Sequence, residues 1–322
     1  MADLGTNAVS VDRAAKRYGA TVALRGLSLS VGRGEMFGLI GPDGAGKTTT
    51  IRLICGLLRA DAGAIRVLGL DPLREHRRLT ASVGYLSQRF SLYGDLSIDE
   101  NIAFFAEIHG VADYTSRRDR LLEMMQLTPF RKRLADRLSG GMKQKLALAC
   151  TLVHEPRVIL LDEPTTGVDP VSRREFWKLL SQFLATGITI LMATPYLDEA
   201  ERCTRVALLD QGKLLALDSP AALRATLPGT LLEVIVPDVR EAHRALRERG
   251  FTAQVFGDRL HVWAGNGANA EAEFTHATAA LMPASRVRAI TPSLEDVYIA
   301  RLQTEHPADA PTVARTEERA GQ

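Results

Sequence analysis

Two kinds of hydrophobic pattern alternate along roughly the first two thirds of this chain. Short continuous apolar runs occur at residues 36–40, 157–161, 188–193 and 205–209. Between them, apolar residues recur at helical spacing. Continuous apolar runs that alternate with helices are typical of parallel strands covered on both faces. Residues 8–12 and 22–31 instead alternate apolar and polar positions, which predicts an antiparallel flank to the sheet.

The intervening segments complete a mixed α/β pattern. Helices are predicted at residues 47–57, 142–154, 171–185 and 196–202, further strands at 64–68 and 82–87, and a mostly helical insertion at 97–137. The acidic residues that follow Ser97 suit the positive end of a helix dipole. We therefore expect a parallel core sheet, an antiparallel β flank and a helical subdomain at about residues 97–154.

The pattern changes after residue 226. Strands at 231–236, 252–256, 260–264 and 286–290 and helices at 239–249 and 270–281 follow in the order βαββαβ, with a closing helix from Ser293. This order resembles a ferredoxin-like unit. We expect a first domain at 8–226, a small α+β accessory domain at 227–303, a flexible N-terminus at 1–7 and a disordered tail at 304–322. No chemical constellation is evident in the accessory domain, which favours a packing or dimerisation module over a ligand-binding gate.

Composition narrows the function classes. Of the 322 residues 46% are hydrophobic and 24% charged, and the net charge is +2. These values describe an ordinary globular protein and argue against a nucleic-acid partner. No apolar stretch approaches the roughly 18 residues of a membrane span, and the N-terminus lacks a secretory pattern. Cys55, Cys150 and Cys203 have no metal-binding spacing, so buried thiols in a reducing compartment are expected.

A glycine-rich loop carries the strongest chemical signal. Residues 36–51 read MFGLIGPDGAGKTTTI, with Gly41, Gly46, Lys47 and Thr48 at the positions of a GxxxxGKT motif between a predicted strand and helix. Backbone N–H groups of such a loop converge on phosphate oxygens, the lysine binds the β- and γ-phosphates, and the threonine hydroxyl is a Mg²⁺ ligand. The alternative is a glycine-rich turn with an incidental lysine. It is disfavoured because the predicted strand before the loop and helix after it are those that the motif requires. The predicted nucleotide-binding loop also includes Pro42, Asp43, Gly44, Ala45 and Thr49.

Two further motifs extend this chemistry. The run VILLDE ends a predicted buried strand with Asp162, which could hold Mg²⁺ through water, and Glu163, which could polarise an attacking water. Ser139, Gly140 and Gly141 begin another helix and form a second nest of N–H donors. One nucleotide does not need two such sites from one subunit. The second is therefore predicted to serve a nucleotide held by another subunit, in a dimer closed around ATP.

Taken together, these motifs resemble the ATP-binding subunit of ABC transporters across about residues 8–226. The phosphate loop, Gln88, LSGGMKQK, LLDEP and the GVD that contains Asp169 occur in the order of that family. The resemblance implies the P-loop NTPase ABC ATPase fold, with ATP and Mg²⁺ as cofactors. It also implies that Tyr18 stacks on adenine.

The resemblance assigns roles to the remaining site residues. It implies that Gln88 joins Thr48 and Asp162 as metal ligands, and that Glu163 is the catalytic base, assisted by Lys47 and Gln88. Ser139 and Gly141, with Gly140 between them, would contact the nucleotide of the partner subunit, and Asp169 would bridge the two subunits.

The closing sequence TPSLEDVYIARL resembles the appendage of the ABC-2 type exporter branch, such as daunorubicin-resistance and multidrug-export ATPases. That branch implies export of a drug or other small amphipathic substrate through polytopic membrane subunits in separate chains. It also implies a second ATP-binding subunit, as a homodimer or heterodimer, and a cytoplasmic location on the inner face of the cell membrane. The alternative is a soluble ABC-type ATPase or regulatory ATP sensor acting on ribosomes or DNA.

One position departs from the family pattern. The strand after the carboxylates normally ends at a histidine that reaches the γ-phosphate, whereas LMATPYLDEAERC places Pro195 there. Proline has neither a side-chain donor nor a backbone N–H. The departure predicts normal ATP binding but slow hydrolysis in this chain's own site.

Overall fold

The computed structural model describes residues 7–88, 91–265, 269–282 and 285–305. The chain divides into two compact units, Met1–Pro220 and Ala221–Gln322, each described here by itself. Most of the predicted flexible ends, residues 1–6 and 306–322, lie outside the described residues. The tail prediction was wrong at its start, because the last helix continues through Glu305 and Thr304 Oγ1 donates a hydrogen bond to the Ala300 carbonyl within it.

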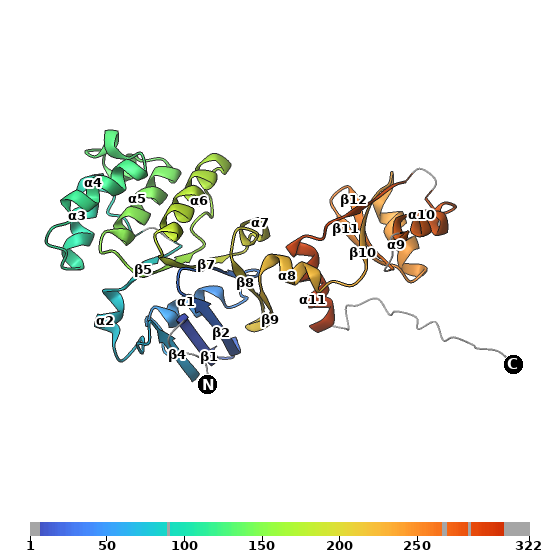
Figure 1. Ribbon diagram of the computed structural model, residues 1–322, viewed down its shortest axis with the longest axis horizontal. Helices are drawn as coiled ribbons and strands as arrows, with labels where there is room; N and C mark the ends of the chain where they lie inside the picture. Colours follow the sequence, from blue (N-terminus) through green and yellow to red (C-terminus); the bar gives the residue numbers. More distant parts are fainter. Residues whose placement is uncertain (1–6, 89–90, 266–268, 283–284, 306–322) are drawn as a thin grey trace. The chain divides into compact units, whose positions relative to one another are not determined.

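A six-stranded sheet forms the centre of the first unit, in the order β5-β6-β7-β3-β8-β9 (Figure 1). Its strands are β3 (Met36–Ile40), β5 (Val83–Leu86), β6 (Val158–Asp162), β7 (Thr189–Thr194), β8 (Arg205–Asp210) and β9 (Lys213–Asp218). Every residue of β3, β6 and β7 is buried, as their continuous apolar runs predict. The strands from β5 to β8 pair in parallel, and β9 pairs antiparallel with β8.

Strand β9 was absent from the sequence-based prediction. It follows β8 through a turn of two residues, Gln211 and Gly212, whose φ angles are 44° and 78°. Positive φ at both central residues is the conformation of a tight β-hairpin turn. The signal was missed because Gln-Gly is a weaker turn signature than Asn-Gly and because β9 is only half-buried.

The antiparallel flank is a separate three-stranded sheet in the order β2-β1-β4. It consists of β1 (Asn7–Tyr18), β2 (Thr21–Gly32) and β4 (Ala62–Val67). Helix α1 (Lys47–Ile54) contacts strands of both sheets and lies between them in Figure 1. It is shorter than predicted because Gly56 takes a φ of 70°, and a Cβ there would lie 2.3 Å from the Pro72 carbonyl oxygen.

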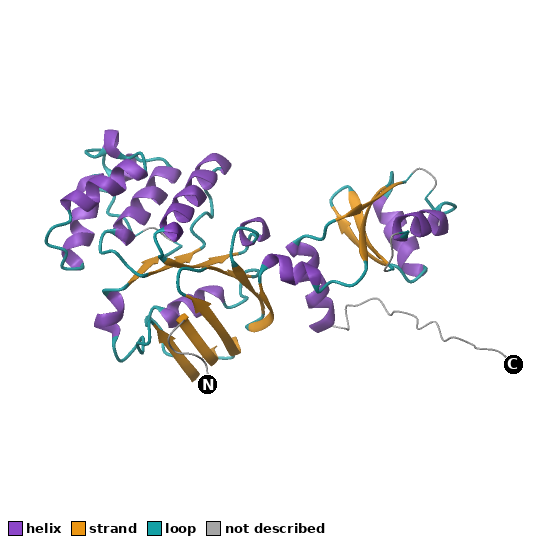
Figure 2. Ribbon diagram, viewed as in Figure 1, coloured by secondary structure: helices purple, strands orange, loops and turns teal. Residues whose placement is uncertain are grey.

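Helices gather on the other face of the large sheet (Figure 2). They are α3 (Ile98–Ile108), α4 (Thr115–Met124), α5 (Gly140–Leu152) and α6 (Pro170–Ala185). The first unit also contains the short helices α2 (His76–Thr80), η1 (Thr128–Phe130), η2 (Ala135–Arg137) and α7 (Leu197–Ala200). Ser97 and Glu100 form a capping box at the start of α3. The fully buried Asn101 donates to the carbonyls of Tyr93, Leu96 and Ser97, which fixes the segment leading into this helix.

The second unit has the predicted βαββαβ order. Its strands β10 (Thr230–Ile235), β11 (Thr252–Phe256), β12 (Arg259–Ala264) and β13 (Arg286–Ile290) form an antiparallel sheet in the order β11-β12-β10-β13. The helices are α8 (Pro220–Ala225), α9 (Val239–Glu248), α10 (Ala270–Thr278) and α11 (Leu294–Glu305). Residues from α9 and α10 pack on the sheet around Leu232, Val262 and Phe274. This strand order is that of the ferredoxin-like arrangement.

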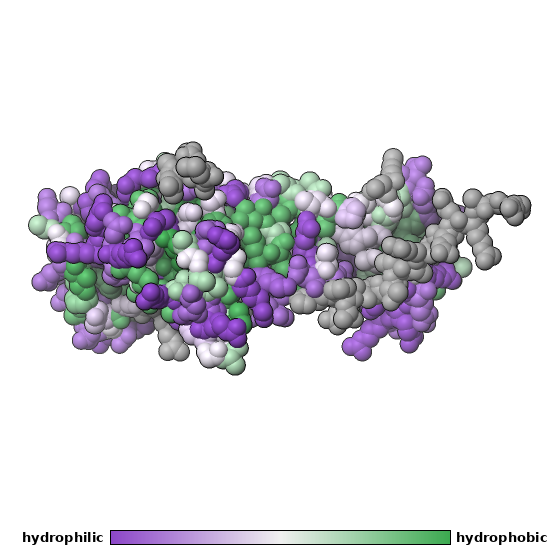
Figure 3. Space-filling model, turned by 90° about the horizontal axis from the view of Figure 1, so that it is seen from below, coloured by the Kyte–Doolittle hydropathy of each residue, from purple (hydrophilic) through white to green (hydrophobic). Residues whose placement is uncertain are grey.

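The surface of the first unit and the state of the three cysteines match what the amino-acid composition predicts. Hydrophilic and apolar side chains are interspersed on the face of the first unit seen in Figure 3. None of the helices in the described part of the chain has the length and apolarity that crossing a bilayer requires. Cys55, Cys150 and Cys203 are buried and form no disulfide, as predicted, and burial raises the pKa of each thiol.

Two stacked histidines join the helical insertion to the core sheet. The rings of His109 and His154 lie 3.8 Å apart at an interplanar angle of 4°. His154 Nε2 lies 3.3 Å from the Val83 carbonyl oxygen. Burial, followed by the neighbouring His109, lowers the pKa of His154 from 6.5 to about 4. The folded state therefore holds His154 neutral at a pH where the unfolded chain protonates it.

The stabilisation that this lowered pKa provides is complete above pH 6.5 and is lost as the pH falls toward about 4. Between pH 7 and pH 5, the His154→Gln variant should lose about 1 kcal/mol less free energy of unfolding than the wild type, after allowance for partial exposure of the ring. When the pH is lowered from 7 to 5, the melting temperature of the variant should therefore fall by about 2–4 °C less than the melting temperature of the wild type. Thermal unfolding at both pH values measures the difference, with exposed His276→Gln as control. Equal losses in wild type and His154→Gln would contradict the assignment.

Candidate functional site

The phosphate-loop motif lies at the carboxyl edge of the parallel sheet. β3 ends at Ile40, which pairs with Thr194 of β7, and Asp162 of β6 pairs with Ala193 of the same strand. Because these strands are parallel, the segments that follow them emerge side by side. The loop after β3 and the carboxylates after β6 therefore flank the end of β7.

Glycines are required at two points of the loop. A Cβ at Gly41 would lie 2.3 Å from the Leu209 carbonyl oxygen, and a Cβ at Gly46 would lie 2.8 Å from the Ala23 carbonyl oxygen. Gly46 also has a φ of 102° and is the N-cap of α1, with no side chain bonded to the first N–H groups of the helix. The amides at this helix start are thus left for a ligand, as anion binding requires. Between these glycines and after them lie Pro42, Asp43, Gly44, Ala45 and Thr49.

Lys47 is buried beneath its own loop. Its Nζ donates hydrogen bonds to the carbonyl oxygens of Gly41 at 2.8 Å and Pro42 at 3.0 Å. It also lies 3.4 Å from Glu163 Oε1. The ammonium group is surrounded by oxygen atoms, which is the environment that phosphate oxygens would also supply.

Thr48 and Asp162 face each other across the space between α1 and β6. Thr48 Oγ1 donates to Asp162 Oδ1 at 2.9 Å, and the Tyr85 hydroxyl lies 3.5 Å from Asp162 Oδ2. Burial raises the pKa of Asp162, and the hydrogen bond from Thr48 opposes that rise. Hydroxyl and carboxylate oxygens are the ligand type that Mg²⁺ prefers. Two of the predicted metal ligands are therefore in contact.

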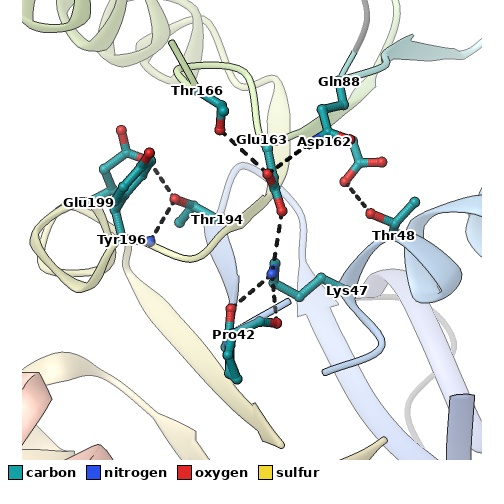
Figure 4. Close-up of polar contacts among 11 residues, drawn as sticks. Pro42, Lys47, Thr48, Gln88, Asp162, Glu163, Thr166, Thr194, Tyr196 and Glu199 are labelled. Carbon is teal, nitrogen blue, oxygen red and sulfur yellow. Dashed lines mark hydrogen bonds and ion pairs between the residues drawn. The ribbon is translucent and has the colours of Figure 1, made fainter. Parts of the chain in front are cut away.

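Glu163 is held in a strained conformation, and Figure 4 shows its contacts. Its φ is 49°, a left-handed value that non-glycine residues adopt at a cost of about 1–3 kcal/mol. Its Oε2 accepts from Gln88 Nε2 at 3.0 Å and from Thr166 Oγ1 at 3.4 Å. Gln88 is thus next to the carboxylate that follows Asp162. In the described part of the chain, the side-chain hydrogen bond of Gln88 goes to Glu163 and not to Thr48 or Asp162, the two other predicted metal ligands.

Ser139, Gly140 and Gly141 lie at the start of α5. Ser139 is the N-cap and its hydroxyl accepts from the Met142 N–H at 3.3 Å. A Cβ at Gly141 would lie 2.3 Å from Ser172 Oγ, so glycine lets α5 approach the start of α6. Across the described ranges of the chain, no hydrogen bond or ion pair joins these three residues to the phosphate loop.

Asp169 and Tyr18 have local roles that the sequence did not suggest. Asp169 Oδ1 accepts from the N–H groups of Val171 and Ser172, both at 3.0 Å, and so caps α6. These bonds lower the pKa of Asp169. Tyr18 ends β1 with 46% of its surface exposed, and Lys16 Nζ lies 5.8 Å from its ring centroid.

Two buried side chains near the site escaped the sequence analysis. Gln144 is fully buried on α5, and its Nε2 donates to the Pro164 carbonyl at 2.7 Å. Glu199 on α7 is 1% exposed and accepts hydrogen bonds from Thr165 and Thr194. Gln144 lies within the LSGGMKQK motif but was given no role there, and Glu199 lies in a polar segment that no motif marks. Pro195 directly follows Thr194, as its alignment with the end of the strand predicts.

Comparisons with known proteins agree with this geometry. Residues 24–166 match the profile of the ABC transporter family. The chain is 41% identical over 285 residues to the probable multidrug ABC transporter ATP-binding protein YbhF of Escherichia coli (strain K12), covering 86% of this chain and 48% of that protein. It is 39% identical over 246 residues to the daunorubicin resistance ATP-binding protein DrrA3 of Streptomyces coeruleorubidus, covering 76% and 78%.

Solved structures give the same result. An ATP-binding subunit of an ABC transporter superposes with a TM-score of 0.62 at 30% identity, over 67% of this chain and 92% of that one. A dimeric structure of MJ0796, a bacterial ABC transporter cassette, gives 0.59 at 25% identity, over 66% and 98%. The chain spans about half the length of YbhF and about three quarters of DrrA3. On this evidence the chain belongs to the family of ABC transporter ATP-binding proteins.

Proposed function

We propose that this chain is the ATP-hydrolysing subunit that energises an ABC-2 type exporter of drugs or other small amphipathic molecules. The observation that carries the proposal is the cluster at one sheet edge, in which Lys47 and Gln88 both contact Glu163, beside the Thr48–Asp162 pair. The named relatives are ATP-binding proteins of multidrug and drug-resistance transporters. Residues 8–226 would form the ATP-binding domain and residues 227–303 the accessory domain.

The site residues fit ATP and Mg²⁺. The uncapped start of α1 and the Lys47 ammonium would bind the triphosphate, with Tyr18 as the candidate stacking surface for the adenine. Thr48, Asp162 and Gln88 would hold Mg²⁺, which neutralises phosphate charge when bound. Glu163 would accept the proton of the attacking water. Its strained backbone and its bond from Gln88 fix the direction in which the carboxylate points.

The proposal includes a second ATP-binding subunit. Ser139 and Gly141 offer N–H groups at the start of α5, and no contact links them to this chain's own phosphate loop within the residues described. They would bind the nucleotide of a partner, in a homodimer or heterodimer, with Asp169 at the contact between subunits. Polytopic membrane subunits in separate chains would complete the exporter, with this chain on the inner face of the membrane. A soluble ATPase or ATP sensor is less well supported, because the relatives are named for transporters.

Replacing Glu163 by Gln should uncouple nucleotide binding from hydrolysis. Removing a general base typically costs about 10²–10⁴ in rate, so ATP hydrolysis should fall by at least about 10²-fold while ATP remains bound. The trapped nucleotide should then hold two subunits together. Native mass measurement in Mg-ATP would detect the dimer, and the Glu163→Gln/Lys47→Ala chain, which lacks the phosphate-binding lysine, serves as the monomeric control. If the Glu163→Gln chain stays monomeric in Mg-ATP, both alone and after co-purification from native membranes, the dimer proposal is contradicted.

Replacing Pro195 by His should increase turnover. One transition-state donor is worth about 10²- to 10³-fold in rate, and Pro195 is only half-buried after β7. We expect kcat to rise toward the lower end of that range with the affinity for ATP unchanged. Steady-state hydrolysis and nucleotide binding measure the two quantities, and Pro195→Ala controls for removal of the proline ring. If Pro195→His is no faster than Pro195→Ala, Pro195 does not stand in the histidine position.

A further inference from the structure

A buried carboxylate outside the nucleotide motifs joins two of the segments that follow the parallel strands. Glu199, on the short helix α7, is 1% exposed. Its Oε1 accepts from Thr165 Oγ1 at 2.5 Å and its Oε2 accepts from Thr194 Oγ1 at 2.7 Å. Thr165 is 1% exposed and Thr194 is fully buried, so both bonds are shielded from water. Burying a carboxylate is costly unless both oxygens find donors, and here both do.

The two threonines belong to functionally distinct segments. Thr165 lies two residues after Glu163 and four residues before Asp169. Thr194 is the last residue of β7, directly before Pro195, and its hydroxyl also accepts from the Tyr196 N–H at 3.1 Å. Because that hydroxyl accepts from Tyr196, its own proton is directed at Glu199. Figure 4 shows Thr194, Tyr196 and Glu199 beside the Glu163 cluster.

Glu199 contributes to a set of contacts that hold the strained turn at Glu163. The Glu163 N–H donates to the Ala193 carbonyl at 2.9 Å, immediately before Thr194. Gln144 holds the Pro164 carbonyl from the opposite side. A non-glycine residue at positive φ persists only where its surroundings over-determine it. Glu199 adds to this restraint because it bonds both Thr165, in the turn after Glu163, and Thr194, at the end of β7.

Arg173 extends these contacts to α6. Its Nε lies 3.8 Å from Glu199 Oε1, and its guanidinium lies 4.8 Å from the centroid of the Tyr196 ring. Its Nε is buried and has no hydrogen-bond partner among the residues described. The contact with Glu199 is thus longer than a hydrogen bond, and the cation stabilises the buried charge without fixing its direction. The orientation of the Glu199 carboxylate is set by its hydrogen bonds from the hydroxyls of Thr165 and Thr194.

We propose that Glu199 is a positioning residue for ATP hydrolysis. Its carboxylate holds Thr165 against Thr194 and thereby keeps the Glu163 carboxylate in line with Gln88 and Lys47. The inference rests on the proposed function, because it assigns Glu199 an effect on the hydrolytic base. Pro195 makes the restraint more important, because this position contributes neither an N–H nor a polar side chain of its own. Glu199 is 1% exposed and acts through Glu163.

The test is single-turnover ATP hydrolysis by the full-length chain carrying Glu199→Ala, Glu199→Gln or Thr165→Val. A misplacement of about 1 Å in a reacting group costs about 10²-fold, so Glu199→Ala should lower the rate about 10- to 100-fold. The concentration of ATP at half-saturation should change less than twofold. Glu199→Gln should lose less, since its amide can still bond both hydroxyls. Thr165→Val keeps the shape and removes only one donor, so it remains informative if Glu199→Ala does not fold.

The decisive readout is coupling to Glu163. If Glu199 acts through the base, Glu199→Ala should cause no further loss of hydrolysis rate in a chain that already carries Glu163→Gln. A merely structural defect would lower the rate by the same factor in the wild-type and Glu163→Gln backgrounds. Asp198→Ala, on the same helix but with 73% of its side chain exposed, is the matched control and should hydrolyse at the wild-type rate.

The outcomes separate the inference from the function on which it rests. A wild-type rate no higher than that of Lys47→Ala would overturn the proposed function and the positioning role together. A normal wild-type rate with Glu199→Ala and Thr165→Val unchanged, or with equal losses in both Glu163 backgrounds, would overturn the positioning role alone.

Discussion

The parallel pairing of β3, β7 and β6 is the constraint on which the site depends. Since β7 lies between the other two strands and all three run in one direction, the loop after β3 and the carboxylates after β6 reach the same edge. Their separation is then set by the spacing of neighbouring strands, about 5 Å each, rather than by loop flexibility. This arrangement allows Lys47 and Glu163, which are far apart in the sequence, to lie 3.4 Å from each other.

A rigid sheet edge does not by itself aim the side chains. Their direction is set by side-chain hydrogen bonds: Gln88 on Glu163, Thr48 on Asp162, Gln144 on Pro164 and Glu199 on two threonines. Each of these contacts joins two different elements. Together they hold Glu163 in a left-handed conformation that an isolated chain would avoid. Local strain is therefore located where the proposed chemistry takes place.

The start of α5 obeys a different constraint. Gly141 allows close packing against Ser172, next to the Asp169 cap of α6, so the Ser139 segment is tied to the segment that contains Asp169. In the proposed dimer these two segments would face the partner. Gln144 of the same α5 helix donates to the Pro164 carbonyl, so α5 also contacts the turn that carries Glu163.

The sequence by itself determined the sheet class and the phosphate-loop motif, and it supplied the candidates for the site residues. Burial periodicity is local, and the spacing of Gly41, Gly46 and Lys47 follows from the reach of a short loop. The βαββαβ order of the second unit was also predictable, because each of its strands and helices has its own pattern. Only the tertiary structure decided which polar residues are buried. Glu199 and Gln144 look like surface residues until α7 and α5 pack against the sheet edge. The left-handed backbone of Glu163 is held by the Ala193 carbonyl of β7, a neighbouring strand that is distant in the sequence.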